Sequence, residues 1–276
     1  MLTLFSCQAI GGDTDDALPA ATAIELFHDF TLIHDDIMDQ DELRRGLTTL
    51  HVKYDEGTAI LVGDLLIGLA YQQLMKSTSP QIDKIINIFT EALVKVCEGQ
   101  ALDKEFETRT DVSVDEYLDM ISKKTGWLIK VACSIGGLSG NAAPEQVELL
   151  TSFGDNLGLG FQIQDDLLDF IADESKLGKK VGSDFRMDKK THVTLKYREL
   201  LQADATLQSR YPMNIPEFNS FSDFQSALYE IGVVESVRKE ADFYIQNALS
   251  ALEKISPLDE NNYLYQITQF LQSRQY

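Results

Sequence analysis

Residues 147–171 read VELLTSFGDNLGLGFQIQDDLLDFI, and this stretch decides the fold class. Its apolar residues recur every three to four positions, at Leu149, Phe153, Leu157, Phe161 and Leu168. That spacing predicts a long amphipathic helix. Residues 82–106 (IDKIINIFTEALVKVCEGQALDKEF) repeat the period, and no run of alternating β-branched residues closes in a hairpin turn. The sequence therefore predicts an all-α fold.

Helices of this kind account for nearly the whole chain of 276 residues, which is long enough to bury a sizeable core. Stretches rich in Gly, Pro, Ser or Asn predict the helix connections, at residues 10–19, 76–81, 136–146, 178–184 and 210–220. None of these is long enough to be a domain linker. We therefore expect a single domain over residues 1–276.

Charge and cysteine content narrow the function classes. The net charge of −20, with no basic stripe, excludes a nucleic-acid partner. The three cysteines are far apart and predict neither a disulfide framework nor a zinc site. The N-terminus lacks a basic leader followed by an apolar run. The most apolar stretch, residues 58–71 (TAILVGDLLIGLAY), is too short to span a bilayer and contains Asp64. We expect a soluble cytoplasmic protein.

Two acidic clusters of the same spacing interrupt apolar helical segments. Residues 34–46 read HDDIMDQDELRRG and residues 161–170 read FQIQDDLLDF. The three aspartates of the first cluster are Asp35, Asp36 and Asp39, and those of the second are Asp165, Asp166 and Asp169. Residues i and i+4 share one face of a helix, so the outer aspartates of each cluster project together.

One such cluster alone is equally well explained as a solvated helix face or an N-cap. Two copies in apolar surroundings favour a functional interpretation, because buried carboxylates without compensation are very costly. Mg²⁺ takes one or two carboxylates and completes its shell with water and substrate phosphates. Two acidic helices facing each other across a cavity would therefore bind a diphosphate through bridging Mg²⁺.

Basic residues accompany both clusters. Arg44 and Arg45 follow the first, where Gly46 is a candidate helix stop. Arginine grips phosphate oxygens with two parallel hydrogen bonds. Residues 178–191 (GKKVGSDFRMDKKT) follow the second cluster, and residues 121–127 (ISKKTGW) break another helical segment. Each lysine taken singly is more simply a surface charge, and only the neighbouring aspartates make it a candidate phosphate ligand.

In this order along the chain, the motifs resemble those of the trans-type polyprenyl (isoprenyl) diphosphate synthases. The resemblance covers nearly the whole sequence and implies a helical bundle around a deep central cavity, commonly a homodimer. It also implies condensation of isopentenyl diphosphate with an allylic diphosphate. The implied cofactor is Mg²⁺, with three ions around the bound diphosphate and Mn²⁺ as a substitute.

The resemblance also assigns roles to matching positions. The metal ligands would be Asp35, Asp36, Asp39, Asp165, Asp166 and Asp169. The allylic diphosphate would be contacted by Arg44, Lys124 and Lys179, assisted by Lys189. Thr125 and Gln162 would lie near the reacting carbons, where their dipoles stabilise cationic charge, and His28 and Arg45 would bind isopentenyl diphosphate. The released diphosphate would take the proton.

This sequence departs from the family pattern at two places. A GGKRxRP segment normally precedes a stretch like MLTLFSCQAIGGD, with about two helices before it, and here that stretch is residues 1–13. We therefore expect an N-terminally truncated synthase, with a partner-completed subunit or an ionisation-only enzyme as alternatives. Asp188 stands where relatives often have glycine, which would perturb the loop that carries Lys189.

Product length in the family is set one turn before the first motif, at positions matching Phe30 and Thr31. A bulky Phe30 would form the floor of the cavity, and the first motif lacks the insertion common in bacterial farnesyl synthases. This favours geranylgeranyl diphosphate (C20), with farnesyl diphosphate (C15) as the alternative. Phe30 could instead pack only in the core.

Three other functions fit the sequence less well. A non-catalytic subunit of a hetero-oligomeric synthase would be expected to lose aspartates from one motif, and this chain keeps all six. A terpene cyclase would carry one such motif and a different second metal motif. A Ca²⁺-binding module would show the ligand loop of an EF-hand, which is not present in the sequence.

Overall fold

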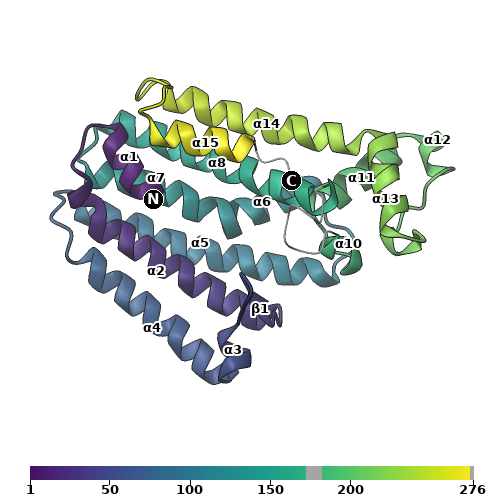
Figure 1. Ribbon diagram of the computed structural model, residues 1–276, viewed down its shortest axis with the longest axis horizontal. Helices are drawn as coiled ribbons and strands as arrows, with labels where there is room; N and C mark the ends of the chain where they lie inside the picture. Colours follow the sequence, from purple (N-terminus) through teal and green to yellow (C-terminus); the bar gives the residue numbers. More distant parts are fainter. Residues whose placement is uncertain (172–181, 274–276) are drawn as a thin grey trace. The chain divides into compact units, whose positions relative to one another are not determined.

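The computed structural model describes residues 1–171 and 182–273. It forms two compact units: unit 1 comprises residues 1–93 and 131–151, and unit 2 comprises residues 94–130 and 152 onward. The described part of the chain is helical apart from one minimal hairpin, which confirms the predicted all-α fold (Figure 1).

Unit 1 carries the first motif on α2. Its own elements are α1 (Leu2–Ala9), α2 (Thr14–Met38), β1 (Leu43–Arg44), β2 (Leu47–Thr48), α3 (Leu50–Lys53) and α4 (Glu56–Leu74). The helices α5 (Ile82–Thr108), α7 (Trp127–Ser139) and α8 (Pro144–Ile171) contribute residues to both units. Helices α2 and α4 lie side by side (Figure 1). On α2, the fully buried Phe27 packs edge-on against Phe89 of α5, with ring centroids 5.3 Å apart.

Unit 2 carries the second motif on α8. Its other elements are α6 (Val114–Ile121), the π-helical segment η1 (Ser122–Gly126), α10 (Ser183–Arg186), α11 (His192–Ala203), α12 (Ala205–Gln208), η2 (Ile215–Glu217), α13 (Phe221–Ile231), α14 (Val233–Leu252) and α15 (Tyr263–Gln272). Phe170, Tyr197 and Phe224 form the centre of its core, with ring centroids 5.8 and 5.1 Å from Phe224. This packing fixes the last turn of α8.

The first motif ends in a hairpin that the sequence did not predict. Helix α2 stops at Met38, and β1 pairs antiparallel with β2 through a two-residue turn at Arg45 and Gly46. Both turn residues have positive φ, 53° and 77°, as a primed hairpin turn requires. The prediction of Gly46 as a helix stop was therefore wrong, because this glycine serves the turn instead.

Two predicted helix connections are shorter than expected. Helix α2 already begins at Thr14, so Pro19 lies within it, and the connection before it shrinks to residues 10–13. Helix α7 continues through Gly136 to Ser139. A Cβ atom on Gly136 would lie 2.2 Å from the carbonyl oxygen of Thr3, so this glycine allows α1 to approach α7 closely. Glycine that permits close packing was mistaken for glycine that breaks a helix.

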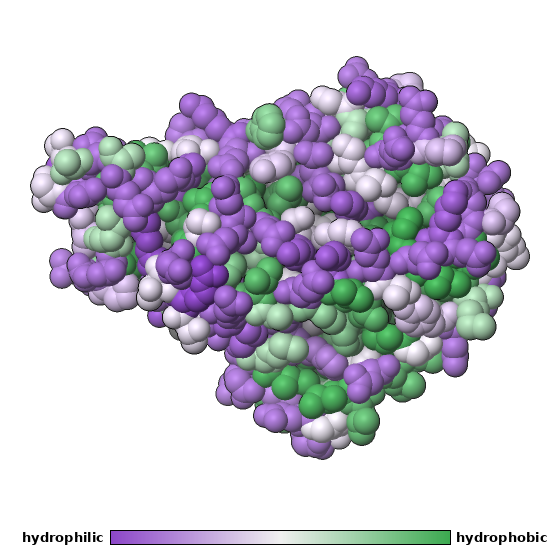
Figure 2. Space-filling model, turned by 180° about the vertical axis from the view of Figure 1, so that it is seen from behind, coloured by the Kyte–Doolittle hydropathy of each residue, from purple (hydrophilic) through white to green (hydrophobic). Residues whose placement is uncertain are grey.

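Helix α4 is longer than its apolar stretch suggested. It has 19 residues, and by length and composition it is the one described helix that could cross a membrane. The helix extends beyond residues 58–71 at both ends, so the apolar stretch is only its central part. The side of α4 that carries Leu61 and Leu65 is exposed, 70% and 60% respectively. Apolar side chains gather over α4 in the lower part of the molecule in Figure 2.

Candidate active site

The first motif occupies the last turn of α2. Asp35 and Asp39 are half-buried, whereas Asp36 is only 6% exposed. Nε of Arg44, on β1, donates a 2.5 Å hydrogen bond to Oδ1 of Asp36. Burial raises the pKa of the Asp36 carboxyl, and the Arg44 guanidinium opposes this rise. The hairpin therefore returns an arginine to compensate the buried middle aspartate.

His28 lies two turns before Asp35, on the same side of α2. Burial lowers the pKa of its imidazole, and the nearby Arg45 and Arg44 act in the same direction. His28 is therefore a neutral hydrogen-bonding group near two guanidinium groups. The charges of Glu25 and Asp29 oppose these effects on the pKa of His28, so its surroundings carry charges of both signs.

The two positions predicted to set product length, Phe30 and Thr31, lie on different sides of α2. Phe30 is half-buried and packs edge-on against His34, with ring centroids 4.7 Å apart. Thr31 donates a 2.7 Å hydrogen bond from its hydroxyl to the carbonyl oxygen of His28. Phe30 is thus held by a neighbouring ring, whereas Thr31 is bonded back to its own helix.

The middle aspartate of the second motif accepts three hydrogen bonds. Oδ2 of Asp166 accepts from the Tyr117 hydroxyl at 2.6 Å and from the backbone N–H of His192 at 3.1 Å. Its Oδ1 accepts from Nε2 of Gln162 at 2.9 Å. Burial raises the pKa of Asp166, and these three donors oppose the rise. Asp166 therefore joins α6, α8 and α11.

Gln162 also contacts the second residue predicted to lie near the reacting carbons. Its Oε1 accepts a 3.1 Å hydrogen bond from the hydroxyl of Thr125. Because its amide nitrogen donates to Asp166, the orientation of the amide group is fixed. The structure thus brings together Thr125 and Gln162, with the carbonyl end of Gln162 beside the hydroxyl.

The outer aspartates of the second motif differ from Asp166. Asp165 is exposed and Asp169 is half-buried. Oδ2 of Asp169 accepts a 3.0 Å hydrogen bond from the backbone N–H of Asp184. Both motifs therefore share one arrangement, in which the middle carboxylate is buried and bonded to protein donors while the outer pair is more accessible.

Asp184 is a candidate site residue that the sequence reasoning missed. Its pKa is raised to about 7, chiefly by burial and then by the charges of Asp169 and Asp166, with Lys189 opposing. A cation near these carboxylates would remove the repulsion. Its position as the last residue of GSD, shortly after the second motif, was the available signal.

The π-helical segment η1 presents Lys124 and Thr125. Nζ of Lys124 donates a 2.5 Å hydrogen bond to Oδ2 of Asp103 on α5. A Cβ atom on Gly99 would lie 2.3 Å from the backbone nitrogen of Lys124, and one on Gly158 would lie 2.7 Å from Cα of Gly126. Two glycines thus let α5 and α8 clamp this segment. The predicted helix break is a π-helical turn, a feature frequent at functional sites.

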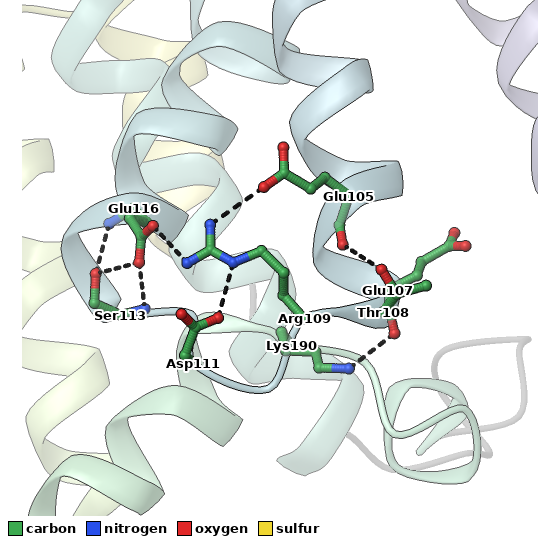
Figure 3. A network of polar contacts seen from close by, with 8 residues as sticks. All are labelled: Glu105, Glu107, Thr108, Arg109, Asp111, Ser113, Glu116 and Lys190. Carbon is green, nitrogen blue, oxygen red and sulfur yellow. Dashed lines mark hydrogen bonds and ion pairs between the residues drawn. The ribbon is translucent and has the colours of Figure 1, made fainter.

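The loop that carries Lys189 is tied to the end of α5. Lys190 donates a 3.0 Å hydrogen bond from Nζ to the carbonyl oxygen of Glu107, next to the ion pairs of Arg109 (Figure 3). Arg109 bonds Asp111, Glu116 and Glu105 at 2.9, 2.8 and 3.4 Å. Lys190 thus has a structural role, which leaves Lys189 as the loop's candidate phosphate ligand.

Asp188, which precedes Lys189, adopts φ of 48°. This left-handed conformation favours glycine, so an aspartate at this position strains the backbone of the loop. Nη2 of Arg198 lies 3.6 Å from its carboxylate. Lys179, the remaining predicted diphosphate ligand, lies outside the described residues.

The donor set suits Mg²⁺ rather than a preassembled metal cage. Among the described residues, no three Asp, Glu, His or Cys side chains converge as a ready metal site. Mg²⁺ needs only one or two carboxylates, since phosphates and water supply its other ligands. The accessible outer aspartates and the raised pKa of Asp184 fit such a cation.

Comparison with known proteins defines the family. The family model for polyprenyl synthetase matches residues 1–226. The chain belongs to the polyprenyl synthetase family. A crystal structure of geranylgeranyl pyrophosphate synthetase from Pyrococcus horikoshii superimposes with a TM-score of 0.90 at 37% identity, covering 99% of this chain and 84% of that one. The motif resemblance is confirmed at the level of family and fold.

Two sequence relatives carry different product names. The geranylgeranyl diphosphate synthase of Sulfolobus acidocaldarius is 48% identical over 208 residues, which cover 74% of this chain and 63% of that relative. The geranylfarnesyl diphosphate synthase of Natronomonas pharaonis is 38% identical over 277 residues, covering 97% of this chain and 78% of that relative. The matched part of this polyprenyl synthetase thus spans less than two thirds of the Sulfolobus protein.

Proposed function

We propose that this polyprenyl synthetase is a Mg²⁺-dependent prenyltransferase that condenses isopentenyl diphosphate with an allylic diphosphate. The arrangement shared by the two motifs supports this function best, because in each the outer aspartates are more accessible than the middle one, which is bonded to protein donors. The outer aspartates Asp35, Asp39, Asp165 and Asp169 hold the metal ions. In this proposal Asp36 and Asp166 position the motifs rather than bind metal.

The other residues act on the substrates. Arg44, Lys124, Lys179 and Lys189 bind the allylic diphosphate, while His28 and Arg45 bind isopentenyl diphosphate. Mg²⁺, when bound, neutralises charge on the departing diphosphate. The Thr125 hydroxyl oxygen and the Gln162 carbonyl present negative dipole ends to the allylic cation. The isopentenyl double bond then attacks that cation, and the new cation loses a proton to the released diphosphate.

The product is geranylgeranyl diphosphate (C20) in this proposal. Phe30, one turn before Asp35, supports it as a bulky group that limits the growing chain. The Natronomonas relative, whose named product is one isoprene unit longer, is the observation that favours a second candidate. Farnesyl diphosphate (C15) is the shorter alternative.

We also propose a cytoplasmic homodimer. The exposed apolar side of α4, defined by Ile60, Leu61 and Leu65, supports burial against a second copy. Replacing Leu61 with Glu and Leu65 with Lys should then give a monomer, as measured by light scattering. An unchanged mass would show that this surface is not the dimer interface.

A product assay tests the proposed activity. Labelled isopentenyl diphosphate is supplied with dimethylallyl, geranyl or farnesyl diphosphate and Mg²⁺, and product lengths are resolved. We expect C20 product, and Asp35→Ala abolishes it. Absence of isopentenyl incorporation, with Mg²⁺-dependent ionisation of the allylic substrate retained, would instead indicate a non-condensing enzyme or a subunit that needs a partner.

A further inference from the structure

The imidazole of His34 lies on the bare backbone of Gly63 in α4. A Cβ atom at Gly63 would lie 2.2 Å from Nε2 and 2.5 Å from Cδ2 of His34. These distances are far inside van der Waals contact, so any larger residue must displace the ring. Gly68 on the same helix has no atom within 4 Å of its Cβ position, so close approach is a property of Gly63 and not of every glycine of α4.

The His34 ring is held on two sides. Its Nε2 lies 3.3 Å from the carbonyl oxygen of Ile60 on α4, and Oδ1 of Asp64 is 3.9 Å away. Its other contact is the edge-on ring of Phe30, at a centroid distance of 4.7 Å and an interplanar angle of 64°. Phe30 therefore rests on a side chain whose own position is set by α4.

Phe30 has a second and more distant aromatic neighbour on α2. The centroid of Phe27, its nearest other aromatic neighbour, is 6.2 Å away and tilted by 34°. Phe27 is fully buried, whereas Phe30 is half-buried. Close-packed rings hold one another in place. If the His34 ring is removed, the half-buried ring of Phe30 can therefore move into the space that His34 occupied.

We propose that Gly63 and His34 are specificity-determining residues: they set the position of Phe30 and thereby the length of the product. This inference rests on the proposed prenyltransferase activity. Gly63 provides the space, His34 fills it, and Phe30 is held against His34. Neither Gly63 nor His34 contacts the substrate in this arrangement; both act through Phe30.

The test compares product lengths for four variants. In Gly63→Ala the new methyl group expels the His34 ring, and in His34→Ala the ring is removed without any change in α4. Both leave Phe30 without its support, and we expect the ratio of longer to shorter products to rise about two- to tenfold, the range given by losing one aromatic contact. The double variant should match His34→Ala alone, because the methyl group then has nothing to displace.

Gly68→Ala is the matched control. It makes the same chemical change on the same helix and gains the same helix propensity, but its methyl group meets no atom of its own chain. Because Gly68 shares the side of α4 with Leu61 and Leu65, light scattering first checks that the variant keeps the mass of the unmodified protein. Its product lengths should equal those of the unmodified chain. Total incorporation and the Mg²⁺ concentration for half-maximal activity are measured in parallel, so that a loss of length control is distinguished from general damage.

Each outcome decides between the two proposals. No condensation product from the unmodified chain would contradict the proposed function itself. Active variants with unchanged product lengths, or an equal change in Gly68→Ala, would overturn the specificity inference and leave the function intact. If Gly63→Ala does not fold, His34→Ala decides alone, since it removes the same support and creates no clash.

Discussion

The Tyr117 hydroxyl donates a 2.6 Å hydrogen bond to Oδ2 of Asp166 and so ties α6 to the second motif on α8. Both groups are almost completely buried, at 4% and 5% exposure. A hydrogen bond to a buried carboxylate is worth more than one to a neutral group. The second motif is therefore held in place by a residue that sequence spacing gives no reason to select.

Tyr117→Phe tests the strength of this tie. The change leaves Asp166 with two donors, and we expect the free energy of unfolding to fall by about 1–3 kcal/mol. Thermal denaturation measures the loss. Tyr229→Phe is the control, because Tyr229 is exposed on α13 and its hydroxyl loss should leave Tm unchanged. An equal Tm shift in both variants would contradict a specific role for Tyr117.

Replacement by asparagine should reduce activity at Asp165 but stability at Asp166. Asp165→Asn removes a proposed metal ligand, so we expect activity to fall at least about tenfold, the Mg²⁺ requirement to rise and Tm to stay the same. Asp166→Asn puts an amide N–H against protein donors and should cost about 1–3 kcal/mol of stability. Mg²⁺ titrations and melting curves of both variants distinguish ligand from positioning residue; the reverse result would contradict the assignment.

Asp188→Gly should stabilise the loop that carries Lys189. Glycine adopts the observed φ of 48° without strain, so we expect a gain of about 0.5–1 kcal/mol in the free energy of unfolding. Urea denaturation checks the gain. Gly232→Ala is the converse control, because Gly232 has φ of 86° and no atom within 4 Å of its Cβ position, so its loss of stability reports backbone strain alone. A destabilised Asp188→Gly protein would show that the contact with Arg198 outweighs the strain.

Stability should decrease on the acid side because of His28. Its pKa is lowered in the folded protein, so between the folded and unfolded values the unfolded chain binds more protons. The stabilising contribution is complete above the unfolded pKa of about 6.5 and is lost as the pH falls through the folded pKa. Denaturation midpoints at a series of pH values check this, and His28→Gln should flatten the slope in that window.

Gly99→Ala should damage the π-helical segment. Its methyl group would lie 2.3 Å from the backbone nitrogen of Lys124, and we expect about 1–3 kcal/mol of destabilisation from overpacking. Turnover should fall as well, since Lys124 and Thr125 move together. Steady-state kinetics and melting curves measure both effects. Gly68→Ala, which fills open space, should show neither.

The helical period of residues 147–171 was enough to predict the fold, because Phe153, Leu157 and Leu168 of the repeat are buried on one helix, while Leu149 and Phe161 are half-buried. The hairpin could not be predicted, since strands of two residues carry no alternation. Glycines were ambiguous for a similar reason. Gly46 lies in a turn, whereas Gly136 allows two helices to pack closely. The residues around each glycine do not distinguish these two roles.

The candidate site was predicted by motif spacing and revised by burial. Spacing predicted Asp35, Asp36 and Asp39 as metal ligands, and the structure distinguishes the middle one by pairing it with Arg44. Asp184 was missed because its proximity to Asp169 depends on how the chain returns after α8. Contacts of this kind are set by tertiary structure, which spacing along one helix does not encode.

The bond between Lys190 and the last turn of α5 joins residues 83 positions apart in the chain. Closing so long a loop costs conformational entropy before the hydrogen bond can stabilise the structure. We therefore expect such contacts to form late in folding. During synthesis this bond cannot form until Lys190 has left the ribosome, whereas the ion pairs of Arg109 with Asp111 and Glu116 can form earlier. A refolding chain should therefore regain helix content, followed by circular dichroism, before it regains catalytic turnover.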